Sequence, residues 1–291
     1  MMATAEAREK RLILFLVSPA SSWLLFFFIL PLCILFVYSF WRFVPGGAMQ
    51  PAFILDNYAR FVTDWYYVKV FGRTLWIGLQ VTFFSLLLGF PVAFTLVRAR
   101  TSVRGILYIL VLSPLLTSAV VRTFGWMILF GTNGFVNRCL MGMGLVTNPV
   151  KFMYTSTAIV IALTEVLLPF MVFSLEAILH NIDKSLYEAA RNLGSNTLKV
   201  FFTITLPLSV PGIAAGSILV FSLAISAFVT PSLMGGPANP VMSTVIYDQA
   251  LNLINWPFGA AISFTLLFII TVILYVYVKL LRLGKLADIL S

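Results

Sequence analysis

The chain has 291 residues, of which 60% are hydrophobic and only 10% are charged, and its mean hydropathy is +1.02. These values exclude a water-soluble globular domain, in which about a quarter of the residues are charged. The formal net charge of +9 therefore has to be interpreted for a membrane protein, where the placement of basic residues reports on topology.

Six apolar runs are each long enough to cross a bilayer. A hydrocarbon layer about 30 Å thick requires roughly 20 residues in a helix, and lipid leaves only helices or closed barrels as spanning structures. The runs are too continuous for the alternating strands of a barrel. The sequence predicts a single all-α membrane domain over residues 1–291, with six transmembrane helices at about 12–41, 72–97, 105–131, 153–179, 205–230 and 258–281.

The start of the first run resembles a secretory signal, because basic residues within 8–11 precede an apolar stretch and a zone of small residues at 18–22. The apolar run resumes at Trp23 and continues to Phe40. We therefore expect an uncleaved first span rather than a leader that is removed.

Basic residues are distributed unequally between the two sides of the membrane. An even number of spans places both termini on one side, and twelve of the 19 Lys and Arg residues lie there, against six on the other side and Arg122 within a run. Because basic residues favour the cytoplasmic side, we expect both termini to be cytoplasmic. The twelve are Arg8, Lys10, Arg11, Arg98, Arg100, Arg104, Lys184, Arg191, Lys199, Lys279, Arg282 and Lys285. The net charge is thus explained by topology, not by nucleic-acid binding.

The cytoplasmic loop between the fourth and fifth runs carries helix-start and helix-stop signals. Ser185 and Glu188 have the spacing of a capping box, which predicts a helix that begins at about Ser185. Leu186, Ala190 and Leu193 then form one apolar stripe. Gly194 suits the left-handed position after a helix, and Ser195 or Asn196 can cap a second short helix.

The same loop matches a longer pattern. Glu188-Ala189-Ala190 is followed after three residues by Gly194, after nine more by Ile204, and then by Leu206-Pro207. In every position this resembles the signature of inner-membrane permease subunits of binding-protein-dependent ABC importers. The alternative is a surface connector with favourable capping.

The resemblance implies the fold of a type I importer permease, with cytoplasmic coupling helices at about 184–200 seated in a cleft of an ATPase subunit. Glu188 would be the main polar contact and Gly194 the hinge, with Ala189, Ala190 and Arg191 in the same element. The implied partners are a second, related permease, two cytoplasmic ATPase subunits and a periplasmic substrate-binding protein. The implied location is the bacterial inner membrane, in contact with lipid and with no nucleic acid.

Three further segments resemble the spermidine/putrescine type of permease. They are Ser113-Pro114-Leu115-Leu116-Thr117-Ser118 with Val121-Arg122-Thr123-Phe124-Gly125-Trp126, then residues 228–237, and then residues 255–261. Permeases for opines, phosphonates and ferric iron share similar stretches, so these substrates remain the alternatives to a polyamine.

Charge within the apolar runs gives a separate indication. An intramembrane carboxylate is costly and usually faces a cavity or a partner, and Glu165 lies within the fourth run, with Asp248 near the outer approach to the sixth. Two acidic groups suit a polycation, and Trp126, Phe228 and Tyr247 could supply cation-π surfaces. Alternatively, Glu165 pairs with Arg122 as a structural link.

A candidate outer gate lies where the fifth run ends. Thr230-Pro231 breaks the run, and Gly235-Gly236-Pro237 follows. Non-helical backbone at membrane depth is tolerated where it lines a cavity. A simple exit loop is the alternative.

Catalytic motifs are missing from the sequence. It contains no phosphate-binding Gly-x-x-x-x-Gly-Lys-Ser/Thr loop, so ATP and Mg²⁺ are expected on partner ATPase subunits and no cofactor is expected on this chain. With His180 as the only histidine and no nucleophile elbow, an intramembrane enzyme lacks a nameable catalytic constellation. We expect a transporter subunit, not an enzyme.

Overall fold

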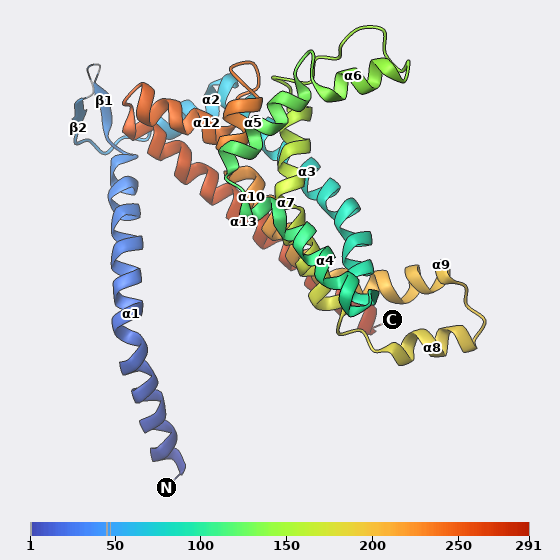
Figure 1. Ribbon diagram of the computed structural model, residues 1–291. Coiled ribbons are helices and arrows are strands. Elements are labelled where there is room, and N and C mark those ends of the chain that lie inside the picture. The colour runs from blue at the N-terminus through green and yellow to red at the C-terminus, as the bar shows by residue number, and fades with distance from the viewer. Residues whose placement is uncertain (1, 45, 47, 291) are drawn as a thin grey trace. The chain divides into compact units, whose positions relative to one another are not determined.

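The computed structural model describes residues 2–44, 46 and 48–290 (Figure 1). The chain groups into two compact units, Met1–Asp64 with Ile246–Leu267, and Trp65–Val245 with Phe268–Ser291. Each unit is considered by itself below. The expectation of a single domain over the whole chain stays a prediction.

The first unit contains the long helix α1 (Met2–Tyr38), a hairpin of β1 (Arg42–Val44) and β2 (Ala48–Gln50), and α2 (Asp56–Thr63). The hairpin is antiparallel, with Arg42 opposite Gln50, and it departs from the all-helical expectation in one short segment. Asn57 of α2 donates hydrogen bonds to the carbonyls of Ser39 and Trp41, which fixes α2 to the end of α1. A π-helical turn, η3 (Asp248–Asn252), and the start of α13 (Trp256–Leu290) complete the unit.

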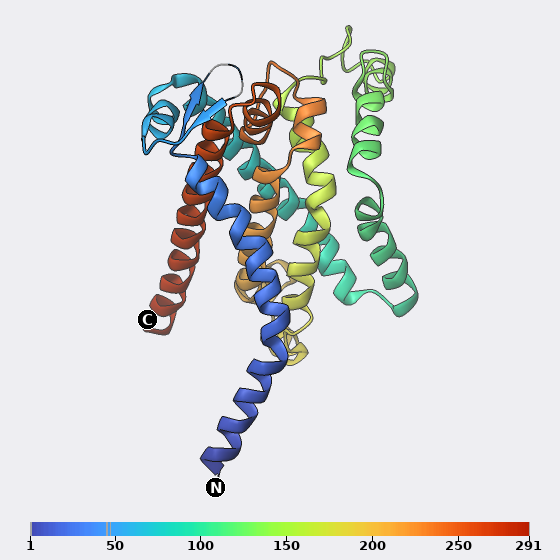
Figure 2. The ribbon, with the colours of Figure 1, turned by 90° about the vertical axis from the view of Figure 1, so that its left-hand side faces the viewer.

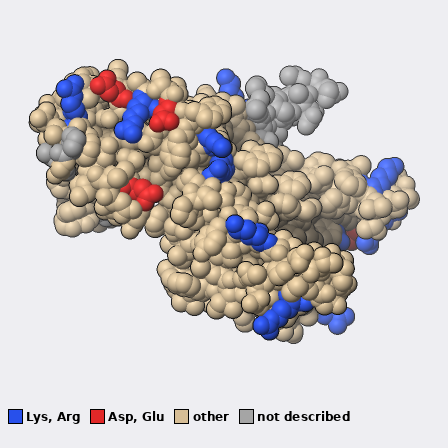
Figure 3. Space-filling view, turned by 90° about the horizontal axis from the view of Figure 1, so that it is seen from above, with Lys and Arg blue, Asp and Glu red and all other residues tan. Residues whose placement is uncertain are grey.

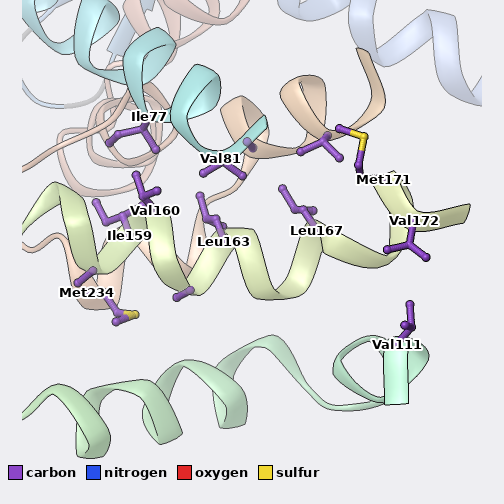
Figure 4. Close-up of a cluster of buried hydrophobic side chains, with 14 of the residues drawn as sticks. Ile77, Val81, Val111, Ile159, Val160, Leu163, Leu167, Met171, Val172 and Met234 are labelled. Carbon is purple, nitrogen blue, oxygen red and sulfur yellow. The ribbon is translucent and has the colours of Figure 1, made fainter. Parts of the chain in front are cut away.

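The second unit is built on three helices that lie side by side: α3 (Trp65–Arg98), α7 (Ser156–Leu179) and α10 (Leu206–Ser226) (Figures 1 and 2). Ile77 and Val81 of α3 point toward Val160 and Leu163 of α7 within one buried cluster (Figure 4). Helix α7 is the most buried of the three, with 61% of its spanning window inside the chain. It is therefore the central element on which the other helices pack.

Helices α7 and α10 approach closely because α10 carries Gly212 and Gly216, four residues apart on one face. A Cβ atom at Gly212 would lie 2.9 Å from the carbonyl oxygen of Ser174, and one at Gly216 would lie 2.6 Å from the sulfur of Met171. The first obstacle is helix backbone, whereas the second is a flexible side chain. The spacing of α7 and α10 thus depends most strongly on Gly212.

We expect Gly212→Ala to destabilise the protein by about 1–3 kcal/mol, because the added methyl group must push two packed helices apart. The measurement is thermal unfolding of the purified protein in detergent. Gly105→Ala is the matched control, since a Cβ at Gly105 of α4 (Thr101–Leu112) meets nothing within 4 Å. Equal unfolding temperatures for the two variants would contradict this account of the α7 and α10 contact.

The third predicted span, 105–131, is not one continuous helix. It is broken into α4, the 3₁₀ turn η1 (Ser113–Leu116) and α5 (Ala119–Phe130), and the two halves are bent by 97°. Pro114 has no N–H to continue the helical ladder, and Thr117 and Ser118 adopt extended ψ angles of 145° and 136°. Expecting a continuous span was wrong because apolar length alone does not register this break.

Five helices in the described part of the chain are long and apolar enough to cross a membrane, and counting the bent pair as one span gives six. The expected helical membrane fold is thus confirmed. Shorter helices also occur, namely α6 (Phe135–Gly142) at the end of the bent pair, and α11 (Val229–Met234) and α12 (Met242–Tyr247) outside the spans. Seen from above, charged side chains are scattered over a largely uncharged surface (Figure 3).

Candidate functional site

The segment 184–200, which we call the coupling segment, contains two short helices, α8 (Lys184–Asn192) and α9 (Thr197–Val200) (Figure 1). The expected capping box is wrong in its cap residue: Asp183, not Ser185, precedes the helix and accepts from the Ser185 N–H at 2.9 Å. Hydrogen bonds from the Ser185 backbone and side chain lower the pKa of Asp183. The cap therefore stays charged at neutral pH and is lost only as the pH falls through that lowered pKa.

The turn between the two helices depends on Gly194, whose φ angle is +76°. Its N–H donates to the Arg191 carbonyl at 2.9 Å, and the Ser195 N–H donates to the Ala190 carbonyl at 3.0 Å. These two bonds form a Schellman motif, in which the left-handed residue is usually glycine. Asn196 then caps α9 by accepting from the Lys199 N–H at 2.8 Å. The chain reverses between two well-capped helices.

Much of the coupling segment faces away from its own chain. Glu188, Ala189, Arg191 and Gly194 are exposed, and Ala190 is half-buried. Leu193 is 86% exposed. The predicted stripe of Leu186, Ala190 and Leu193 is therefore not packed against the helices of this chain.

The inner side of α8 is held by aromatic and cationic groups. Arg98, at the end of α3, lies over the rings of Phe94 and Tyr187, with its guanidinium carbon 3.8 and 5.4 Å from their centres. The Tyr187 hydroxyl accepts from Thr205 at 3.4 Å. A cavity of about 520 Å³ between α3, the end of α7 and α8 is lined by Arg98, His180 and Glu188, among others. A force on α8 would thus be passed to the ends of α3 and α10.

The predicted pathway residues Arg122, Trp126 and Glu165 are brought together between α5 and α7. The Arg122 Nε and the Trp126 Nε1 each lie 3.5 Å from Glu165 Oε2. The Glu165 side chain is 31% exposed, against 13% for Arg122. Glu165 is thus paired with Arg122 and also lines a cavity, and its place in a substrate pathway stays a prediction.

Arg122 has a second set of partners at the break in the third span. Its Nη1 donates to the carbonyl oxygens of Pro114 and Thr117, and the Thr117 hydroxyl also donates to the Pro114 carbonyl. One guanidinium thus satisfies the broken backbone and faces the carboxylate of Glu165.

The remaining predicted pathway residues are divided between the two units. Thr230 of α11 is buried and shares a hydroxyl hydrogen bond of 3.2 Å with Thr123 of α5. Phe228 lies at the start of α11. Tyr247 and Asp248 belong to the first unit, where Asp248 accepts from the Asn252 amide at 2.7 Å. A common pathway for all seven residues stays a prediction.

The sequence analysis missed a charged cluster near the other end of α7. Glu176 accepts from Arg104 of α4 at 2.8 Å and also from the Tyr108 hydroxyl. The signal was available, because Glu176 is a second carboxylate within the run 153–179. From the sequence alone, Arg104 is only one of the basic residues that mark the cytoplasmic side. The cluster joins α4 to α7 close to the coupling segment.

The sequence matches the family described as binding-protein-dependent transport system inner membrane component over residues 10–282. The chain belongs to this family. It is accordingly a multi-pass permease component of a membrane transport system and not an enzyme. Both the motif at 188–207 and the helical fold agree with this assignment.

One relative is similar to this chain over almost the whole length of both proteins. The spermidine/putrescine transport system permease protein PotB of Salmonella typhimurium (strain SL1344) is 37% identical over 269 residues, covering 92% of this chain and 93% of the relative.

Two solved structures share the fold. A bacterial ABC transporter involved in the import of the acidic polysaccharide alginate has a TM-score of 0.76 at 21% identity, and the match covers 97% of this chain and 99% of that one. The bacterial alginate ABC transporter in complex with an alginate pentasaccharide-bound periplasmic protein has a TM-score of 0.74 at 20% identity, with 94% of each chain covered.

Proposed function

We propose that this chain is a permease subunit of an ATP-driven importer that carries a polyamine of the spermidine or putrescine type across the bacterial inner membrane. The observation that carries the proposal is the 37% identity to a spermidine/putrescine permease over almost the whole of both chains. The carboxylate of Glu165 in the middle of α7 adds support, because it suits a cationic solute. Opines, phosphonates and ferric iron are the alternative cargoes.

The coupling segment is proposed to dock in a cleft of a cytoplasmic ATPase subunit. Glu188 would make the main polar contact, and the exposed Leu193 would enter an apolar part of the cleft. ATP and Mg²⁺ would bind to two such subunits, while this chain holds no cofactor. A second, related permease and a periplasmic binding protein are proposed to complete the assembly, and the alginate transporter complex, which contains a periplasmic protein, supports the latter by analogy.

ATP binding would act through the coupling segment. Closure of the ATPase pair moves α8 and α9, and the contacts of Tyr187 and Arg98 pass that movement to α3 and α10. The ATPase thus biases a membrane element between inward-facing and outward-facing states, which requires contacts that differ between the two states. In this orientation both termini lie in the cytoplasm, as the basic residues indicate.

The transmembrane pathway is proposed to pass the groups that the second unit contributes through Arg122, Trp126, Glu165, Phe228 and Thr230. Tyr247 and Asp248, which belong to the first unit, are candidate pathway residues on the strength of the sequence alone. Thr230 is a candidate gate residue because its buried hydroxyl bonds across to α5. The cavity that Glu165 lines, against α3, α5 and α7, supports a pathway at this place in the second unit.

The test is uptake of radiolabelled spermidine into liposomes that contain the complete transporter with its own partner subunits. We expect ATP-dependent uptake by the wild-type protein. Uptake should be abolished by Glu188→Lys, which reverses the charge of an exposed side chain without disturbing the core. Glu188→Gln is the matched control and should retain most activity. Wild-type uptake by Glu188→Lys would contradict the docking role, and uptake of another solute alone would contradict the proposed cargo.

A further inference from the structure

A cavity of about 550 Å³ lies within the second unit, against α3, α5 and α7. Its polar lining consists of Gln80, Trp126, Thr157, Thr164 and Glu165, and its other walls are apolar side chains such as Phe84 and Leu168. Glu165 lies about 14 Å along α7 from the start of that helix, given a rise of 1.5 Å per residue. The cavity therefore lies at the level of the hydrocarbon core, where polar lining is costly unless it has a partner.

Only one oxygen of the Glu165 carboxylate contacts a donor within the described part of this chain. The contacts from Arg122 and Trp126 both go to Oε2, and among the described residues Oε1 accepts no hydrogen bond. The guanidinium of Arg122 is held at its other end by the Pro114 and Thr117 carbonyls. Arg122 is thus held between Glu165 Oε2 and the backbone carbonyls.

Thr164 supplies an independent sign of a missing partner. Its side chain is 95% buried, since only 5% of the residue is exposed, and its hydroxyl oxygen makes no hydrogen bond within the described part of the chain. A threonine in a helix normally satisfies its hydroxyl on the carbonyl four residues earlier, as Thr82 does with Gly78 at 2.8 Å. An unsatisfied buried hydroxyl costs about 1–3 kcal/mol. The hydroxyl oxygen is closed to solvent in this structure, so a ligand in the cavity that Thr164 lines would remove this cost once the side chain turns about its Cα–Cβ bond.

We propose that this cavity is a transient binding subsite for one ammonium group and the adjoining methylene chain of a polyamine during translocation. Glu165 Oε1 accepts a hydrogen bond from the ammonium group, the Thr164 hydroxyl accepts another after its side chain turns, and the Gln80 amide oxygen adds a further acceptor. The face of Trp126 and the apolar walls cover the methylene chain. The inference rests on the proposed function, and it assigns to Gln80 and Thr164 a role in selecting the cargo.

The test uses the complete transporter in liposomes with spermidine as the probe. We expect Glu165→Gln to lower the maximal rate of uptake at least tenfold, as the loss of one charged hydrogen bond implies. Glu165→Asp should recover part of the rate. Since capture is performed by the binding protein, the half-saturating spermidine concentration should not change. ATP hydrolysis stimulated by the binding protein should also persist, which a merely structural defect would not allow.

Thr164→Val is the second variant, because removing an unsatisfied hydroxyl should not impair folding. We expect its uptake rate to fall about threefold to tenfold, whereas Thr82→Val, a control outside this cavity, should match the wild type. Uptake by the wild type together with unchanged rates in Glu165→Gln and Thr164→Val would overturn the subsite alone. Absence of spermidine uptake by the wild type would overturn the proposed cargo as well, so the two failures are distinguishable.

Discussion

Replacing Gly194 by proline is expected to abolish uptake while the protein remains in the membrane at its normal abundance. The φ angle of Gly194 is +76°, and proline is restricted to about −65°. The substitution also removes the N–H that donates to the Arg191 carbonyl. The turn between α8 and α9 cannot then form, so the two helices lose their relative orientation. The core helices are unaffected because Gly194 is exposed.

Gly194→Asn is the matched control for this prediction. Asparagine tolerates the left-handed region better than other side chains, and nothing lies within 4 Å of a Cβ atom at this position. We expect most of the uptake to survive, with ATP hydrolysis still stimulated by the binding protein. Both rates should be measured in liposomes, next to membrane abundance by immunoblotting. Normal uptake by Gly194→Pro would refute a role of this turn in energy coupling.

The coupling segment illustrates how far local sequence signals carry. The positive φ at Gly194 was predictable because it depends on a single residue type in a fixed local geometry. The cap of α9 was predictable only as Ser195 or Asn196, because both side chains can accept from the first turn, and Asn196 is the cap. For α8 the sequence predicted a cap at Ser185, whereas the structure has the cap at Asp183, two residues earlier. Both residues fit a helix that begins in this short stretch, so local signals alone do not choose between them. The contact of Tyr187 with Arg98 joins residues almost ninety positions apart in the chain, and no periodicity within the loop signals such a pairing.

For the membrane helices, the sequence predicted where the spans lie but not every internal break or contact. Apolar length located every span, since that requirement is set by bilayer thickness. It did not reveal the break at Ser113–Leu116, because small hydroxyl residues and one proline scarcely lower the hydropathy of a run. Of the surroundings of Glu165, the sequence predicted the ion pair as one of two alternatives but did not place the cavity. Its pairing with Arg122 follows from opposite charges in neighbouring runs, whereas the cavity beside it depends on how α3 packs against α7.

Arg122→Met is expected to destabilise the protein by about 2–4 kcal/mol, measured as thermal unfolding in detergent. The change leaves the Thr117 carbonyl without its side-chain donor, leaves the Pro114 carbonyl with only the Thr117 hydroxyl as a side-chain donor, and leaves Glu165 without its cation. The estimate is below the full value for a buried pair because the Glu165 side chain is 31% exposed. Arg122→Lys should recover only part of the loss, since an ammonium group lacks the planar fork that reaches both sites.

A double-mutant cycle separates the two roles of Arg122. If the ion pair contributes, Glu165→Gln in the Arg122→Met background should cost less stability than it does alone, because no cation remains to be left unpaired. If Arg122 acts only on the broken backbone, the two effects will add and the coupling energy will be close to zero. A wild-type unfolding temperature in Arg122→Met would contradict both roles. The cycle therefore decides whether Glu165 is held in place by charge or by the packing of α5 on α7.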